Sequence, residues 1–336
     1  QYRNAVADLV AKSPPIKPSP DKHGLQAEYY KSRDMRRRNE QVYTRLDPQV
    51  KFDFGPDFPD RDKFDPKGFS VRWKGSLIAP DTGLYDFIVR SDEAVKFWLN
   101  ETDDDKPTVD AWVKSEDDHE RRFSMFLVGG RAYPIMLEFS SYRQGVNDSD
   151  KRKNVKAEPA FVELKWRRPH GIEEVIPARH LSPDVGPMVY VVSTPFPPDD
   201  RSVGYGRGIS ASRAWADAQT NAAIDAARYV AAHLGDLAGI RQLDPEDKDA
   251  LRDYCVQWVE RAFRRPLTDA QRKVYIDRQF EDAPDLESAL KRVIVLSLTS
   301  PRFLYLDMGD EEPDGFDIAS RLWFALWDSI ADQALR

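Results

Sequence analysis

The chain has 336 residues, a formal net charge of −7 at pH 7, and 41% hydrophobic residues. This length favours two or more domains, and the apolar share is sufficient for real cores. The mild negative charge argues against a nucleic-acid partner, because phosphate binding needs clustered positive charge. No apolar run reaches membrane-spanning length. The single cysteine, Cys255, allows neither an internal disulfide nor a zinc cluster.

The first apolar residues share the face of an amphipathic helix, which predicts a helix within residues 1–12. That face consists of Tyr2, Ala5, Val6, Leu9 and Val10. Prolines then recur through residues 13–23. Because proline is excluded from the interiors of helices and sheets, this tract predicts an extended linker.

Residues 24–184 have the pattern of β-structure, with short strands separated by Asp, Pro, Gly and Lys. The clearest stretch is residues 69–100, in which Val71, Trp73 and Gly75 alternate with polar residues before a turn at 80–83. Period-two alternation interrupted by such turns predicts an antiparallel sheet with one buried face. Many short strands of this kind predict a β-sandwich or barrel.

Residues 185–211 read as a connector, and residues 212–336 change to helical periodicity. The fold class predicted is therefore α+β and multidomain, with an antiparallel sandwich followed by an all-α domain that we expect to be truncated at its C-terminus. Three helix starts carry capping residues, namely Asp244, Thr268 and Asp317. Cys255 lies on an apolar helical stripe, which predicts a buried core thiol.

Motifs of known catalytic chemistry are missing from the sequence. The glycines of residues 204–208 are followed by no Lys-Ser or Lys-Thr pair, so a flexible helix entry is predicted there rather than a phosphate loop. The five histidines show no HExxH spacing, and neither a GxSxG elbow nor a CxxCH haem site is present. The chain is predicted to be non-catalytic.

An acidic pair, Asp92 and Glu93, marks a predicted loop tip between two strands. Carboxylates on a loop that a rigid sheet holds can bind a hard cation or sugar hydroxyls. Calcium needs six to eight oxygens, so further ligands would have to come from residues after the next strand: Asn100, Asp103, Asp104 and Asp105. In the alternative interpretation, Asp92 caps the turn by accepting from backbone N–H groups, and Glu93 is solvated.

Trp98 is a further candidate, because a flat aromatic face suits the apolar face of a pyranose. Its place in the strand points it away from the side that Phe97 and Leu99 share. The alternative for Trp98 is packing in a core or between domains.

Several stretches within residues 24–183 resemble the anthrax protective-antigen-type domain, a lectin-like β-sandwich. They are GLQAEYY at 24–30, the whole of 69–100, LVGGRAYPI at 127–135, VELKW at 162–166, IP at 176–177 and LSP at 181–183. They occur in order and cover about half of the chain. In sugar-binding members of that family this loop carries two aspartates that hold calcium, which in turn binds sugar hydroxyls; here the second position is Glu93.

The flanking segments resemble large planctomycete-type envelope proteins built from domains of unknown function, which often carry a cytochrome module. The similar motifs are FRRPLT at 263–268, SPRFLY at 300–305 and ASRLWFALW at 319–327, with QYRNAVADL at 1–9 and FPPDD at 196–200. In those proteins the last two segments are close in sequence, so we infer that the β module is inserted into a helical domain. Arg264 and Arg265 are expected at a helix end, paired with acidic neighbours or carbonyls.

The two resemblances together imply a carbohydrate-binding or scaffold fragment of a larger periplasmic, cell-envelope or secreted protein. Its partners would be a polysaccharide or glycan, the rest of the parent protein and other envelope proteins. The fragment itself is expected to hold no cofactor, with calcium as an option. The candidate sugar-binding residues are Asp92, Glu93, Trp98 and Asn100, and the candidate metal ligands are Asp92, Glu93, Asp103 and Asp104. The alternatives are part of a haem-linked redox enzyme acting on sugars, or a structural assembly module.

Overall fold

The computed structural model describes residues 2–11, 21–33, 40–54, 68–113, 119–142, 160–197, 212–306 and 312–327, with a few single residues and pairs between them. Most of the predicted linker and the glycines of residues 204–208 lie outside the described residues. The chain divides into two compact units. One comprises residues 15–189, and the other combines residues 1–14 with residues 190–336.

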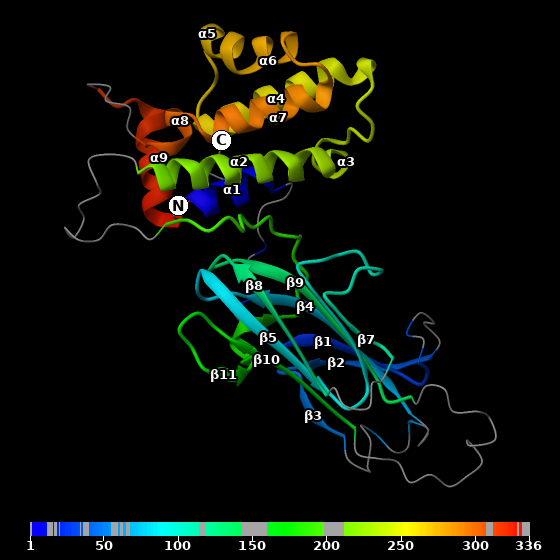
Figure 1. The fold of residues 1–336 in the computed structure, drawn as a ribbon. Coiled ribbons are helices and arrows are strands. Elements are labelled where there is room, and N and C mark those ends of the chain that lie inside the picture. The colour runs from blue at the N-terminus through cyan, green and yellow to red at the C-terminus, as the bar shows by residue number, and fades with distance from the viewer. Residues whose placement is uncertain are drawn as a thin grey trace. The chain divides into compact units, whose positions relative to one another are not determined.

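Unit 15–189 is a sandwich of two antiparallel sheets, which confirms the predicted fold class (Figure 1). The first sheet has the strand order β2-β1-β4-β9-β6-β7, with β12 also paired to β4. Its strands are β1 (Leu25–Tyr30), β2 (Gln41–Asp47), β4 (Ser70–Ile78), β6 (Ala94–Leu99), β7 (Val109–Ala111), β9 (Ala132–Ser140) and β12 (Leu181–Ser182).

The second sheet has the order β11-β10-β5-β8, with β3 also paired to β10. Its strands are β3 (Lys51–Asp53), β5 (Gly83–Ser91), β8 (Glu120–Leu127), β10 (Phe161–Arg167) and β11 (Glu173–Val175). A short 3₁₀ helix, η3 (Ala178–His180), precedes β12. Alternate residues of both sheets form the sandwich core, since Trp73, Phe87, Phe97 and Trp166 are fully buried.

Gly75 lies where β4 changes its neighbour from β1 to β12. A Cβ atom at this position would come within 2.1 Å of the Ser182 carbonyl oxygen. Only glycine therefore allows β12 to pair this closely with β4, which returns the chain across the sandwich.

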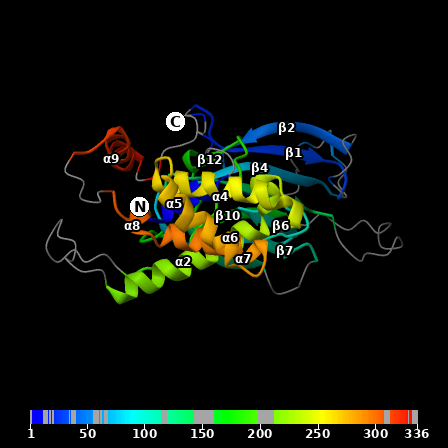
Figure 2. The same cartoon turned by 90° about the horizontal axis from the view of Figure 1, so that it is seen from above.

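The other unit is helical. Its elements are α1 (Tyr2–Val10), α2 (Arg213–Ala232), α3 (Leu234–Ala238), η4 (Pro245–Asp247), α4 (Lys248–Phe263), α5 (Asp269–Arg272), the π-helix η5 (Lys273–Asp277), α6 (Arg278–Glu281), α7 (Leu286–Leu298), α8 (Pro301–Leu304) and α9 (Gly315–Trp327). Helices α2 and α4 both pack against α7, and Figure 2 shows the three alongside one another. None of the described helices has the length and apolar character that a membrane span requires.

Helix α1 belongs to the helical unit although about 200 residues separate it from α2. Val6 and Leu9 are buried in the same apolar cluster as residues of α2, α4 and α7. The Arg261 guanidinium of α4 also donates to the Asp8 carbonyl over 2.8 Å. The sandwich thus interrupts the sequence of the helical unit, with α1 before it and the other helices after it.

The cap predicted for the last helix was one turn too late. Helix α9 begins at Gly315, and Asp314 accepts the Asp317 backbone N–H over 3.0 Å. The Asp317 carboxylate accepts the Asp314 N–H in return over 3.1 Å. Asp314 is therefore the capping residue, and Asp317 completes a reciprocal capping box. Cys255 is buried as predicted, and burial raises the pKa of its thiol to about 12.

Candidate functional site

The acidic tip lies between β5 and β6, and Ser91 fixes its backbone. The Ser91 hydroxyl accepts the Glu93 N–H over 3.1 Å. The same hydroxyl lies 3.2 Å from the Glu93 carbonyl oxygen and 3.1 Å from that of Phe161. Ser91 therefore performs the capping that the alternative interpretation assigned to Asp92, and it ties the tip to the start of β10.

Asp92 makes a different contact. Its carboxylate lies 2.7 Å from Nδ1 of His119, the residue before β8. The Ser91 N–H also donates to the His119 carbonyl over 3.0 Å. The tip is thus held from the β8 side and from the β10 side, while the Asp92 side chain keeps 34% of its surface exposed. This places a carboxylate rigidly at the rim of the second sheet.

A depression of about 620 Å³ opens beside Asp92. That volume lies within the range of small-ligand sites. The residues that line the depression come from β3, β5, β10 and the tip: Lys51, Phe52, Asp53, Arg90, Asp92, Phe161 and Glu163.

Ion pairs hold the polar side chains of the depression. Glu163 lies 3.1 Å from Arg90 and 3.7 Å from Lys51. The Arg90 guanidinium also lies over the Phe161 ring, 5.9 Å from its centre. The lining thus combines nitrogen donors, carboxylate acceptors and an aromatic ring. Such a surface suits a ligand that carries several hydroxyl groups and one apolar face.

Trp98 and Asn100 have structural contacts that set them apart from this depression. Trp98 is buried, and its indole Nε1 is within hydrogen-bond distance of no partner among the described residues. Asn100 follows the far end of β6, where its amide donates to the Val189 carbonyl and accepts the Val189 N–H, both over 2.8 Å. Both polar atoms of the Asn100 side chain therefore hold the chain that follows the sandwich.

The four predicted metal ligands fall into two groups. Asp92 and Glu93 precede β6, whereas Asp103 and Asp104 follow it. A strand rises about 3.3 Å per residue, so the two groups are separated by about 20 Å and cannot bind one ion. Asp103 instead pairs with Lys106 over 2.9 Å, and that hydrogen bond holds the pKa of the Asp103 carboxyl below its ordinary value.

The described residues assemble no calcium cage at either end of β6. Among the residues that the structure describes, no three Asp, Glu, His or Cys side chains gather in a way that could hold a metal ion. Calcium needs six to eight oxygens, so the described protein groups do not fit it by themselves. A role for calcium stays a prediction.

Sequence reasoning identified Asp92 but missed most of the depression. Lys51, Arg90, Phe161 and Glu163 are brought together by the pairing of β10 with both β3 and β5. These residues lie up to about 110 positions apart in the chain, and no local spacing connects them. The one available signal was the alternation of β10, which puts Phe161 and Glu163 on the face opposite to the buried Val162 and Leu164.

These features define a two-sheet β-sandwich, inserted in the sequence of a helical unit, with an open depression at one rim. The family model of the PA14 domain matches residues 21–179, which contain every strand except β12. The protective-antigen-type resemblance is thereby confirmed for this part of the chain. No finding connects the helical unit to planctomycete-type or cytochrome-linked proteins, and that resemblance stays a prediction.

The sandwich is also similar to individual proteins. The anti-sigma-I factor RsgI3 of Acetivibrio thermocellus is 30% identical over 167 residues, which are 50% of this chain and 22% of that protein. The chain thus matches only about a fifth of the length of this curated relative. A solved anti-sigma factor domain-containing protein from Clostridium clariflavum is 23% identical, with a TM-score of 0.39 and coverage of 52% of this chain and 51% of that one.

A third similar structure is the A domain of epithelial adhesin 6 from Candida glabrata, solved in complex with Galβ1-3GlcNAc. It is 14% identical to this chain, with a TM-score of 0.37, and the match covers 51% of this chain and 93% of that domain.

Proposed function

We propose that the sandwich is a non-catalytic carbohydrate-binding module of a larger secreted or cell-envelope protein, and that the sugar binds in the depression beside Asp92. The observation that carries this proposal is the composition of that depression. It presents Arg90 and Lys51 as donors, Asp92 and Glu163 as acceptors, and the Phe161 ring on one surface. The PA14 match over the same residues supports the assignment.

Sugar hydroxyls both donate and accept hydrogen bonds, so a lining of mixed sign can satisfy adjacent hydroxyls of one ring. A vicinal pair would donate to Asp92 or Asp53 and accept from Arg90. The pyranose carbons would lie on Phe161, where apolar burial adds to the binding free energy. Hydrogen bonds to charged groups are the stronger ones, which compensates for the openness of the depression.

The direct test is a glycan array with the whole chain, followed by calorimetry on the glycans that bind. Asp92→Asn and Arg90→Gln should each weaken binding about tenfold or more, because each removes a hydrogen bond to a charged group. Asp103→Asn is the matched control, since it removes a carboxylate at the other end of β6. Absence of binding to every glycan, or an equal loss in Asp103→Asn, would contradict the proposal.

Calcium assistance is tested in the same titration, with and without a chelator. Because the described carboxylates do not form a cage, the sugar and water would have to supply most ligands of such an ion. A chelator effect that Asp92→Asn abolishes would support a calcium role. Unchanged affinity in the presence of the chelator would contradict a role for calcium and would be compatible with the proposed sugar site.

One observation favours the assembly alternative. Helix α9 exposes Ile318, Leu322 and Leu326 at i, i+4 and i+8, and Leu326 keeps 67% of its surface exposed. An uncharged stripe of this kind can pair with a second copy of itself about a twofold axis. Concentration-dependent dimerisation that Leu322→Glu abolishes would support that role, and a monomer at every concentration would exclude it. The redox alternative needs a haem module outside these residues, and no described residue favours it.

A further inference from the structure

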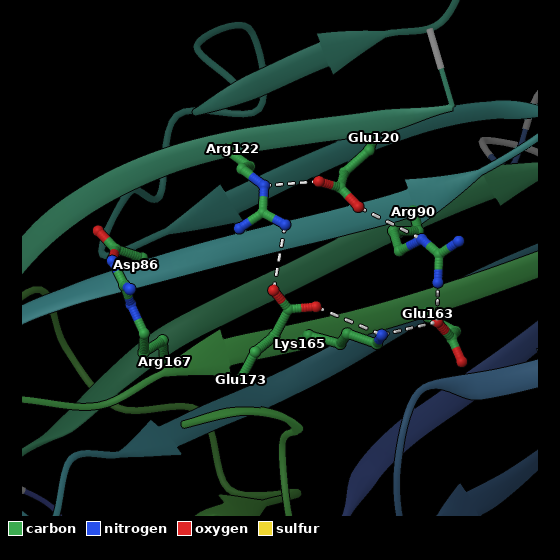
Figure 3. Close-up of polar contacts among 8 residues, drawn as sticks. All are labelled: Asp86, Arg90, Glu120, Arg122, Glu163, Lys165, Arg167 and Glu173. Atoms are coloured by element: carbon green, nitrogen blue, oxygen red, sulfur yellow. Dashed lines mark hydrogen bonds and ion pairs between the residues drawn. The ribbon is translucent and has the colours of Figure 1, made fainter. Parts of the chain in front are cut away.

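Six charged side chains form a closed ring on the outer face of the second sheet (Figure 3). Each member contacts a neighbour of opposite sign on either side. The successive distances are 3.1 Å for Glu163–Arg90, 3.4 Å for Arg90–Glu120, 2.5 Å for Glu120–Arg122, 3.1 Å for Arg122–Glu173, 3.5 Å for Glu173–Lys165 and 3.5 Å for Lys165–Glu163. We call this set the charge ring; its three cations and three anions balance.

The ring takes residues from four strands and encloses one apolar side chain. In the strand register, Ile88 of β5 lies opposite Lys165 of β10 and Arg122 of β8. Ile88 is completely buried although it lies on the outer face. The aliphatic stems of the flanking Lys165 and Arg122 can cover it while their charged ends reach the carboxylates. The ring therefore fixes side-chain positions across the sheet.

Two members of the ring also line the depression, namely Arg90 and Glu163. Glu163 is the most buried of the six, with 16% of its side chain exposed, and it accepts from cations on three sides. On the far side of the ring, Arg122 and Glu173 are not among the lining residues. Within the ring, Glu120 connects Arg122 to Arg90, and Lys165 connects Glu173 to Glu163.

We propose that Arg122 and Glu173 are positioning residues, which set ligand affinity by holding Arg90 and Glu163 in place without touching the ligand. This inference rests on the proposed sugar site. If Glu173 loses its charge, Lys165 is left with Glu163 as its partner and Arg122 with Glu120. Glu163 and Glu120 are also the two carboxylates that bind Arg90. Arg90 then competes with Lys165 and Arg122 for them and no longer has one preferred geometry. A preorganised site loses affinity when its supporting contacts loosen.

The test measures the affinity of the whole chain for the tightest glycan of the array. Glu173→Gln and Arg122→Gln should each weaken binding about threefold to fivefold, the upper end of what an exposed ion pair contributes. Arg167→Gln is the matched control, because Arg167 pairs with Asp86 on the same face but outside the ring. It should bind like the wild type.

Two further readouts separate positioning from a general loss of structure. In 1 M salt, where screening acts over about 3 Å, wild-type affinity should fall to the level of Glu173→Gln, and the variant should hardly respond. Lys165→Arg should keep wild-type affinity, whereas Lys165→Met should lose as much as Glu173→Gln. The Glu173, Arg122 and Lys165 variants should all have melting temperatures close to that of Arg167→Gln.

Wild-type affinity in Glu173→Gln and Arg122→Gln would overturn this inference while leaving the sugar site intact. An equal loss in Arg167→Gln would also overturn it, because any charge removed from this face would then have the same effect. A wild-type chain that binds no glycan would instead refute the proposed function itself.

Discussion

Removal of the Asp47 carboxylate should destabilise the sandwich more than removal of any single charged side chain on its surface. Asp47 ends β2 and is 3% exposed. One of its oxygens accepts from the Tyr29 hydroxyl over 2.9 Å and from the Trp73 indole N–H over 2.8 Å. The other oxygen lies 2.5 Å from Nε of Arg45. One carboxylate thus joins β1, β2 and β4.

The magnitude follows from what each variant leaves unpaired. Asp47→Ala removes three hydrogen bonds to a charged acceptor and leaves the buried donors of Tyr29 and Trp73 without it. Arg45 is 42% exposed and can turn to water. The loss expected from two orphaned buried donors and a broken ion pair is about 3–5 kcal/mol. Asp47→Asn keeps one acceptor oxygen for both donors, so its cost should be only about 1 kcal/mol.

Hydrogen exchange in increasing urea, followed by mass spectrometry on peptides of β1 and β4, can measure this within the whole chain. A peptide-resolved method is needed because a chain of two units need not unfold in one step. Peptides of α4 and α7 serve as the internal control and should hardly change. A loss below about 1 kcal/mol in Asp47→Ala, or equal losses in both variants, would refute this reasoning.

Three further predictions concern the rest of the fold. Gly75→Ala should separate β12 from β4 and speed exchange around Ser182, because the new Cβ would meet its carbonyl; unchanged exchange would contradict the close approach. Leu9→Ala removes a buried side chain and should lower the stability of the helical unit by about 2–5 kcal/mol. Unchanged hydrogen exchange in α4 would show that α1 does not stabilise that helix. The hydrogen bond from Arg122 lowers the pKa of Glu173, so its stabilisation is present above the ordinary carboxyl pKa and is lost as pH falls through the folded value. The urea midpoint of the sandwich should therefore fall between about pH 5 and pH 3, and an equally steep fall in Glu173→Gln would contradict this.

The strands that alternation predicts are those with one fully buried face. β4 and β10 follow period two closely, with Trp73 and Trp166 on the buried side. The sequence analysis did not single out β2, and its burial does not alternate, since Thr44, Arg45 and Leu46 are exposed in succession. β7, β11 and β12 have only two or three residues each, which is too short for any period to appear.

Local sequence pattern also could not predict most residues of the candidate site. The sequence identified the tip at Asp92, because a loop between two clear strands can be located from local pattern. It could not identify Lys51, Phe161 or Glu163, since these meet only when β10 pairs with two other strands. Asn100 was a reasonable ligand candidate from its residue type, yet its amide binds Val189, 89 positions further along the chain. Long-range pairing decides which polar residues are available.

The adjacent arginines Arg264 and Arg265 make different contacts. Arg265 pairs with Asp314 and Asp317 at the start of α9, at 3.3 Å and 2.5 Å. Arg264 donates to the carbonyls of Arg302 and Tyr305 over 2.8 Å and 3.0 Å, and burial lowers its pKa to about 10. Both interactions agree with the expectation that these arginines bind acidic neighbours or carbonyls.

Arg264 also ends α4 with a φ of 61°, a conformation that normally favours glycine. Glycine would relieve that backbone but could not supply the guanidinium that binds the end of α8. The residues of this motif are therefore explained by packing between helices, without any chemistry on a ligand. The resemblance of this motif to envelope proteins stays a prediction, and the case for a binding function rests on the depression and the charge ring of the sandwich.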